Sequence, residues 1–166
     1  MRQVPIGKHW IFILGFVAVL LAACGPSKTA KEARKTFNGN WTLTSVTYPN
    51  SSGEFDVTLL NDANASCFEN STWNFVSNNN RGAYTVQGPN CSAGQRYFVW
   101  SIDEENTPEG IFDFLLKPTD EDYNSTTGNQ GFRMNLRSLS ETQMVWEQSV
   151  MLEGSPFVIR MNFSKL

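Results

Sequence analysis

The amino-acid sequence predicts an all-β domain built as an eight-stranded antiparallel up-and-down barrel. Three observations carry this prediction. Apolar and polar side chains alternate along eight short segments, residues that favour turns separate these segments, and no window shows a long pattern with the 3.6-residue period of a helix. A β-sandwich satisfies the same alternation and stays open as the alternative. The barrel is favoured because closing a sheet removes its exposed strand edges.

The expected strands are spread along the chain from Trp41 to Phe163. The alternation is cleanest near the C-terminus, where Phe157 and further apolar residues at every second position share one face. Short connections, such as residues 153–156, favour pairing between strands that are neighbours in the sequence. Residues 55–65 are the one place where a short helical turn is expected. The eight expected strands are residues 41–48, 72–76, 83–86, 96–102, 111–116, 132–136, 142–152 and 157–163.

The N-terminus carries the features of an export signal. Arg2 and Lys8 lie in a short cationic stretch, and residues 10–21 form an apolar run that only Gly15 interrupts. This run is too short to span a bilayer as a helix, which needs about 20 apolar residues. A cationic start, a short apolar run and small residues after it are typical of a secretory signal.

Residues Leu21-Ala22-Ala23-Cys24 follow directly and resemble the bacterial lipobox. In that motif a lipid is attached to the cysteine thiol, and the signal is cut just before it. The resemblance implies a lipoprotein signal peptide at residues 1–23 and anchoring to a membrane through lipid on Cys24. It also implies a location in the bacterial cell envelope; Gly25 is compatible with the outer membrane, while the face and the oligomeric state are left open. An ordinary secretory signal that ends near a cysteine is the alternative.

The rest of the chain divides into a tether and one domain. Residues 24–36 are polar and basic without hydrophobic periodicity, which predicts a flexible tether. Residues 37–166 have the length of a single domain. The formal net charge is −3, and loss of Arg2 and Lys8 with the signal makes the mature chain more acidic. Nucleic-acid binding requires a basic patch, so no nucleic-acid partner is expected.

Two cysteines, Cys67 and Cys91, remain after Cys24. Exported proteins meet an oxidising environment, in which two spare cysteines usually pair. The sequence therefore predicts a disulfide between Cys67 and Cys91 that joins two loops at one end of the domain. Two free thiols are the alternative.

The mature chain lacks the side chains that most enzymatic sites need. The sole histidine of the sequence, His9, lies in the signal, so neither a Ser-His-Asp triad nor a histidine-bound zinc is expected. No glycine-rich phosphate loop is present. Residues 120–124 imitate the start of a calcium loop, but Ser125 and Gly131 stand where such a loop needs Gly and Glu. The sequence thus predicts a protein without enzymatic activity, cofactor or metal.

The head of the first strand carries a short motif. Gly39-Asn40-Trp41 resembles the Gly-x-Trp signature of lipocalins, which lies near the closed end of an eight-stranded up-and-down barrel. Residues 139–146 and 161–166 look like the closing strands of small lipocalin-like lipoproteins from bacterial envelopes. The resemblance implies a barrel that is closed near Trp41 and holds one small apolar or amphipathic ligand.

Lipocalins usually place an arginine from the end of the barrel over the tryptophan of this motif. Arg160 is the candidate in the last strand, with Arg133 and Arg137 as alternatives, but all three fall on polar strand faces. The sequence leaves open whether an arginine covers Trp41.

The apolar strand faces leave two functions open. A barrel lined by aromatic and Met side chains can enclose a small apolar ligand, and the lipocalin resemblance favours this function. The same large rings can also fill an eight-stranded barrel, which would leave a structural or interaction lipoprotein that contacts another envelope component. Trp100 and Trp146 are expected to report a bound ligand by quenched fluorescence. The expected ligand-binding residues are Trp100, Phe112, Phe114, Phe132, Met134 and Trp146.

Overall fold

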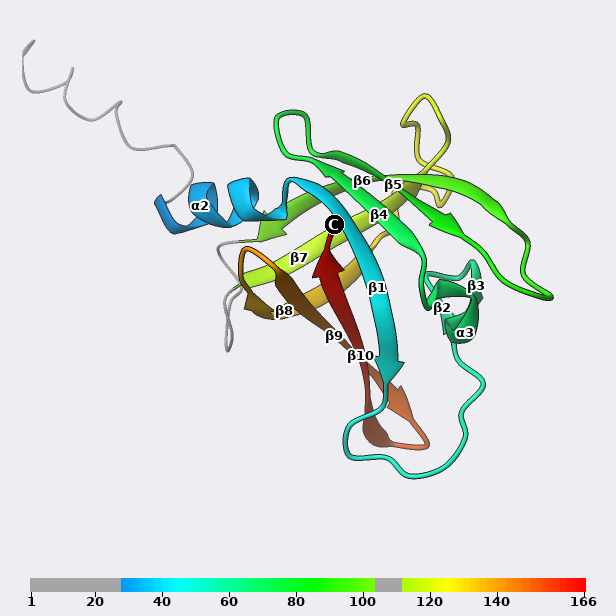
Figure 1. Cartoon of the computed structure of the whole chain (residues 1–166). Coiled ribbons are helices and arrows are strands. Elements are labelled where there is room, and N and C mark those ends of the chain that lie inside the picture. Colours follow the sequence, from blue (N-terminus) through cyan, green and yellow to red (C-terminus); the bar gives the residue numbers. More distant parts are fainter. Residues whose placement is uncertain (1–27, 104–111) are drawn as a thin grey trace, which may run out of the picture.

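The computed structural model describes residues 28–103 and 112–166; the expected signal peptide and Cys24 lie outside the described residues. Within them, eight antiparallel strands close into a barrel in which neighbours in the sequence are neighbours in the sheet (Figure 1). The prediction of an up-and-down barrel is confirmed. The strands are β1 (Gly39–Thr47), β4 (Thr72–Val76), β5 (Arg81–Val86), β6 (Gly94–Asp103), β7 (Phe112–Thr119), β8 (Phe132–Leu139), β9 (Gln143–Leu152) and β10 (Ser155–Lys165).

The barrel closes through β1, which pairs with β4 on one side and with β10 on the other. Trp41 faces Trp73 across the first pairing and Lys165 across the second. The β1–β10 register shifts between Leu43 and Ser45, a local bulge of the kind that bends strands in barrels. Below, the closed end is the end at which β1 begins, and the mouth is the end at which β10 begins.

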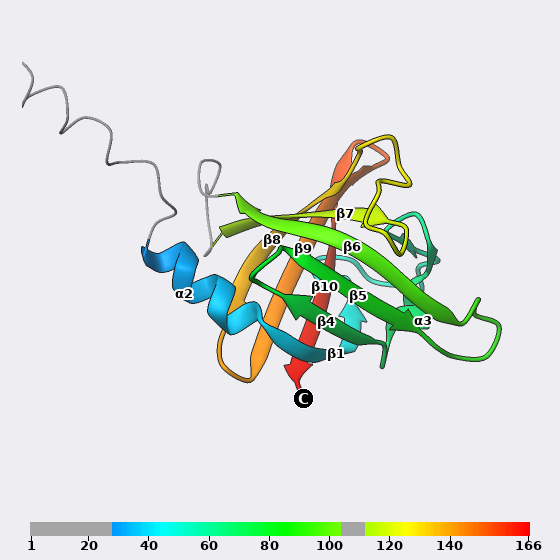
Figure 2. The same cartoon turned by 90° about the horizontal axis from the view of Figure 1, so that it is seen from above.

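Helix α2 (Lys28–Phe37) occupies most of the segment that the sequence predicts as a flexible tether. Ala30, Ala33 and Phe37 lie three and four residues apart and are all buried, so a narrow apolar stripe holds the helix against the barrel. The tether prediction missed this stripe because two alanines among lysines give little hydrophobic contrast. Figure 2 shows α2 leading into β1. No helix among the described residues is long and apolar enough to cross a membrane.

The connection between β1 and β4 has structure of its own. β2 (Thr58–Leu59) and β3 (Ala63–Asn64) form a two-stranded sheet, and α3 (Ala65–Phe68) follows directly. Leu59 and Phe68 are buried, so the connection packs onto the barrel. The helical turn expected within residues 55–65 therefore lies later in the chain, since α3 begins at Ala65 and extends beyond that range, and the small sheet was not expected.

Large rings fill the middle of the barrel. Trp146 contacts Trp73, Phe114 and Phe163 at ring-centroid distances of 5.5, 4.8 and 4.4 Å. Phe37 enters from α2 and stacks on Phe114 at 5.3 Å. Each of these five side chains is at most 2% exposed. The inner strand faces therefore form a close-packed aromatic core.

Candidate ligand-binding site

A cleft of about 300 Å³ opens at the mouth of the barrel. The β1–β4 connection forms one wall, and the start of β8 with the β9–β10 hairpin forms the other. The apolar lining residues are Phe55, Val57, Leu60, Phe132, Val150, Leu152, Phe157 and Ile159. The polar lining residues are Asp56, Thr58, Asn61 and Gln148. Concave sites with apolar walls and a few polar groups are the usual form of small-molecule sites.

Two aromatic rings that line this cleft, those of Phe55 and Phe157, contact each other and a third ring, that of Tyr48. Phe157 points inward at the start of β10, where the alternation of that strand places it on the core side. Its ring lies 5.0 Å from the ring of Phe55 and 5.3 Å from that of Tyr48, and the rings of Tyr48 and Phe55 are 5.2 Å apart. Such mutual contacts favour one arrangement of the rings, so the cleft is pre-formed on this side.

The predicted disulfide between Cys67 and Cys91 is confirmed. It joins α3 to the loop between β5 and β6 at the mouth. Nearby, the Asp62 carboxylate accepts hydrogen bonds from Tyr84 Oη at 3.0 Å and from Arg96 Nε at 3.1 Å. These links tie the β1–β4 connection to the barrel, so that connection is a fixed wall of the cleft.

The mouth carries negative charge. Asp56 lines the cleft, and the Glu69 carboxylate accepts a hydrogen bond from the backbone N–H of Val46 at 2.9 Å. Burial raises the pKa of Tyr48, and the charges of Glu69 and Asp56 raise it further. Among the described residues, neither Lys nor Arg lines the cleft. The cleft therefore suits a neutral or positively charged ligand better than an anion.

The opposite end of the barrel is closed around Trp41. Its indole nitrogen donates a hydrogen bond of 2.8 Å to the carbonyl oxygen of Phe37, which fixes α2 against β1. The Lys165 ammonium lies 5.1 Å from the Trp41 ring centroid and donates to the carbonyl oxygen of Thr36 at 2.9 Å. Gly39 turns the chain between helix and strand with φ at +118°, a conformation that favours glycine.

A lysine thus covers Trp41 in the position where the family resemblance suggests an arginine. The three arginines considered for this role are engaged elsewhere. Arg160 and Arg137 both contact the Glu147 carboxylate, at 2.7 and 3.4 Å. Arg133 pairs with two aspartates, each at 2.8 Å.

Residues 37–146, more than half of the chain, match the family described as lipocalin-like domain. The chain belongs to this family. Lipocalin-like domains form a family that binds small hydrophobic ligands. No curated protein matches the chain well enough to be named as a relative.

Several solved structures resemble this lipocalin-like chain at low sequence identity. A lipocalin-like protein from Bacteroides uniformis is 13% identical over 79% of this chain and 99% of that chain, with a TM-score of 0.46. An uncharacterized protein from Bacteroides eggerthii is 11% identical over 78% and 99%, with a TM-score of 0.46. Bovine odorant binding protein, in complex with a selenium-containing odorant, is 9% identical over 86% and 75%, with a TM-score of 0.44.

The lipocalin-like barrel separates the six residues that the sequence analysis assigned to ligand binding. Phe132 lines the mouth cleft. The other five are buried in the hydrophobic core: Trp100, Phe112, Phe114, Met134 and Trp146. Trp100 also stacks on Phe37 of α2 at 5.3 Å, which places it toward the closed end. Of the six, only Phe132 is brought to the cleft.

The remaining cleft residues come from two parts of the chain. Gln148 and Val150 lie on β9, where the period-2 alternation already puts them on the same face as Trp146. The sequence did not indicate that Gln148 and Val150 lie near the mouth of the barrel. Phe55 and Leu60 lie in the β1–β4 connection, and no periodic pattern there indicates that the segment folds over the mouth.

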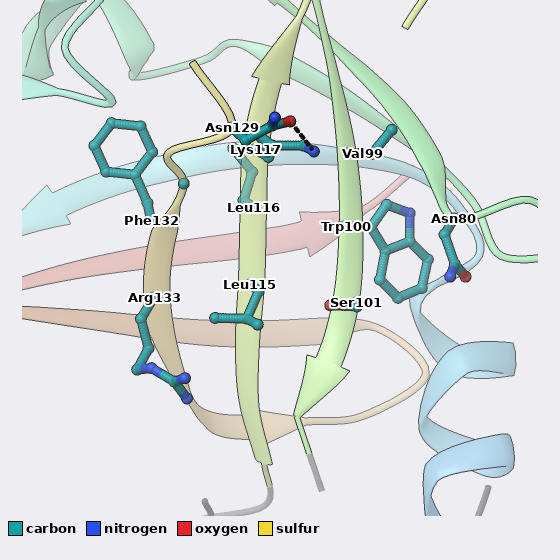
Figure 3. A pocket seen from close by; sticks show the side chains of 11 residues that line it. Asn80, Val99, Trp100, Ser101, Leu115, Leu116, Lys117, Asn129, Phe132 and Arg133 are labelled. Carbon is teal, nitrogen blue, oxygen red and sulfur yellow. Dashed lines mark hydrogen bonds between the residues drawn. The ribbon is translucent and has the colours of Figure 1, made fainter. Parts of the chain in front are cut away.

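A larger hollow of about 560 Å³ lies on the outer wall of the lipocalin-like barrel (Figure 3). Outward side chains of β6, β7 and β8 line it, among them Val99, Leu115 and Lys117. Trp100 and Phe132, two of the six residues expected to bind a ligand, also line it. The Lys117 ammonium donates a hydrogen bond to Asn129 Oδ1 at 3.2 Å, and Arg133 is paired as described above. This hollow, called the outer groove below, lies outside the barrel wall, and Lys117 and Arg133 in it already have partners. We therefore assign the ligand site to the mouth cleft.

The acidic turn at residues 120–124 is explained by its own backbone. Asp120 Oδ1 accepts hydrogen bonds from the backbone N–H groups of Asp122 and Asn124, at 3.0 and 2.8 Å. This is a common way for aspartate to shape a turn. Within residues 28–103 and 112–166, no cluster of three or more His, Cys, Asp or Glu side chains is arranged to hold a metal ion.

Proposed function

We propose that this chain is a lipid-anchored lipoprotein of the bacterial envelope whose barrel binds one small apolar or amphipathic ligand in the mouth cleft. The observation that carries the proposal is the cleft itself: about 300 Å³, apolar on most sides, and bounded by a connection that a disulfide ties down. Its volume lies at the lower end of the usual range for small-molecule sites. The ligand is therefore small.

The packed core directs the ligand to the mouth. Trp146 and Phe114 are fully buried and in contact with each other, so a ligand between them would have to displace rings from a close-packed core. The cleft needs no such displacement. The acidic surroundings of Asp56 further support a ligand without negative charge.

Binding of the neutral fluorophore N-phenyl-1-naphthylamine to the purified protein tests the ligand site. Gln148 lines the cleft and is only half-buried, so Gln148→Trp fills the cleft with little disturbance of the core. Leu115→Trp places the same side chain in the outer groove as a matched control. We expect Gln148→Trp to lose binding and Leu115→Trp to keep it; the reverse pattern, or binding that both variants keep, would reject the site.

The anchoring part of the proposal is supported by the lipobox resemblance of residues 21–24. Intact-mass analysis of protein extracted from membranes tests it. We expect a mature chain that begins at Cys24 and carries added acyl mass, and we expect Cys24→Ser to abolish lipid attachment. A mature protein without acyl mass would overturn the anchoring proposal and leave the ligand site untouched.

An interaction role is the second candidate, and one feature of the mouth favours it. Val150, Met151 and Leu152 at the tip of the β9–β10 hairpin are 39%, 69% and 48% exposed. Exposed apolar clusters of this kind often mark contact surfaces for other proteins. Failure of the fluorophore to bind, together with the absence of any co-purified small molecule by mass spectrometry, would favour this role over ligand binding.

A further inference from the structure

A second cleft lies at the closed end of the barrel, between α2 and the turn that joins β4 to β5. Its volume is about 470 Å³, and Lys31, Arg34, Lys35, Asn38 and Ser77 are among its lining residues. It is separate from the mouth cleft, because α2 packs where β1 begins and the mouth lies where β10 begins.

Hydrogen bonds fix the two walls of this cleft to each other. Asn38 Oδ1 accepts from both the backbone N–H and the hydroxyl of Ser77, at 3.0 and 3.1 Å. Arg34 Nη1 donates to Asn80 Oδ1 at 2.7 Å. The helix and the turn therefore form one structure with a defined space between them.

This cleft is positively charged, whereas the chain as a whole is negatively charged. Lys31, Arg34 and Lys35 line it, whereas no carboxylate of the described residues does so. The chain as a whole has an excess of acidic residues. Basic residues in the last turn of a helix complement its dipole, which accounts for Arg34 and Lys35 but not for Lys31 on the preceding turn.

Arg34 supplies an independent sign of an anionic ligand. Its Nε is buried and has no hydrogen-bond partner among the described residues. The guanidinium is thus held by a neutral amide, that of Asn80, and one of its donors is unused. The buried Nε cannot be reached from the cleft, but the guanidinium lines the cleft and has no carboxylate of the described residues paired with it. Guanidinium groups match the oxygens of a phosphate in geometry and charge, so a phosphate in this cleft would balance this charge.

We propose that this basic cleft binds the phosphate of an anionic phospholipid headgroup and so docks the closed end of the barrel on the membrane surface. The choice of a lipid over free phosphate rests on the proposed anchoring at Cys24. Three residues lie between Cys24 and Lys28, the first residue of α2, so these four residue steps span at most about 14 Å. Headgroups next to an acylated Cys24 are therefore within reach of the cleft.

Amide hydrogen exchange of the full mature protein in lipid nanodiscs tests this docking. One preparation contains phosphatidylcholine alone, and the other contains phosphatidylcholine with phosphatidylglycerol. We expect residues 31–38 and 76–80 to exchange at least about fivefold more slowly in the anionic discs, the factor that one basic residue near an anionic surface contributes. Equal exchange in the two discs would overturn the proposal.

Two variants test whether the slower exchange depends on the cations of the cleft or on the total charge of the protein. Lys31→Gln with Lys35→Gln removes two exposed cations of the cleft and is expected to abolish the difference between the discs. Lys117→Gln removes one cation from the outer wall and is expected to preserve it. Loss of the difference in Lys117→Gln, or its persistence in the double variant, would reject the cleft as the docking site.

Two further experiments identify the source of the phosphate and distinguish a failure of the docking proposal from a failure of the anchoring proposal. Inorganic phosphate added to the phosphatidylcholine discs is expected to give no protection; full protection by it would replace the lipid with a free anion. If the protein proves to lack a lipid anchor, dihexanoylphosphatidylglycerol in solution must still slow exchange at residues 31–38, and dihexanoylphosphatidylcholine must not. Absence of that effect would overturn the headgroup site.

Discussion

The ammonium group of Lys165 lies over the ring of Trp41, 5.1 Å from its centroid, and donates a hydrogen bond to the carbonyl oxygen of Thr36. One side chain from the end of β10 thus contacts both the first strand and α2. Trp41 in turn donates to the carbonyl oxygen of Phe37. The closed end of the barrel is therefore held by a small network that joins the two ends of the domain.

Replacement of Lys165 by Gln is expected to destabilise the protein. The variant loses a cation–π contact and a charged hydrogen bond, which together contribute about 1–3 kcal/mol to the free energy of unfolding. Urea unfolding at a constant denaturant slope measures the loss. Lys165→Arg should retain most of the stability, because it keeps a cation over the ring; equal losses in both variants would show that the charge over Trp41 does not matter.

The disulfide between Cys67 and Cys91 is expected to stabilise the domain. The two cysteines are 24 residues apart, and closing a loop of that length contributes about 3 kcal/mol in the chain-entropy model. Unfolding with and without reductant measures this contribution. The variant with Ser at both positions should be weaker by the same amount and insensitive to reductant, and unchanged unfolding of the natural chain under reductant would contradict the prediction.

Two tryptophans of the core differ in one hydrogen bond and allow a direct comparison. Trp73 Nε1 donates to Ser71 Oγ at 2.8 Å, whereas Trp146 Nε1 is buried without a hydrogen-bond partner among the described residues. Trp73→Phe leaves the buried Ser71 hydroxyl without its donor, so it should cost about 1–3 kcal/mol more than Trp146→Phe. Thermal or urea unfolding of both variants measures the difference, and a larger loss in Trp146→Phe would refute it.

Tyr84 should make the protein sensitive to alkali. Burial, followed by the charge and hydrogen bond of Asp62, raises the pKa of Tyr84 above its ordinary value of 10.0. The folded state therefore keeps this proton where the unfolded state loses it. The stability from this proton is fully present below about pH 10 and falls by up to about 1.4 kcal/mol per pH unit above it.

Unfolding free energies measured between pH 8 and pH 12 test this dependence. Tyr84→Phe should reduce the slope above pH 10, although it also loses the bond to Asp62 at neutral pH. Tyr97→Phe on the outer wall serves as the control and should leave the contribution of Tyr84 in place. An unchanged slope in Tyr84→Phe would contradict the assignment.

Tryptophan fluorescence should be insensitive to a ligand in the mouth cleft. Trp100 stacks on Phe37 and Trp146 lies in the packed core, so neither lines the cleft. Saturation with octanol, which does not absorb in the near ultraviolet, should leave their emission unchanged. A Phe157→Trp variant places a reporter in the cleft and should respond. A strong response of the natural chain would place the ligand in the core or in the outer groove, which Trp100 lines, instead of in the mouth cleft.

The strands could be predicted from the sequence because the barrel has one apolar and one polar face. Phe157 and Ile159 are buried and are separated by one half-buried residue. This two-residue alternation can be recognised in the sequence without any knowledge of the tertiary structure. The disulfide followed from the small number of cysteines. Both features depend on residue type and local spacing alone.

The site and the helix depended on contacts that the sequence does not contain. Ala30 and Ala33 become a helix face only because the closed end of the barrel lies against them. Trp100 was expected in a ligand pocket because its strand face is apolar. Alternation shows which side chains point into the barrel, but it does not show whether the interior at that height is packed with side chains or left open for a ligand. The cover of the mouth at Phe55 came from a segment without periodicity.

The direct junction of α2 to β1 determines how the domain bears mechanical load. A pull on the N-terminal segment enters the barrel at Gly39 after passing through the helix. We expect the helix to detach first, because it is held by a few side chains such as Phe37 and by the bond from Lys165. β1 is then loaded along its length against β4 and β10 together. The hydrogen bonds of both pairings then resist the force together in shear. We therefore expect α2 to detach at a lower force than the force that separates β1 from the barrel.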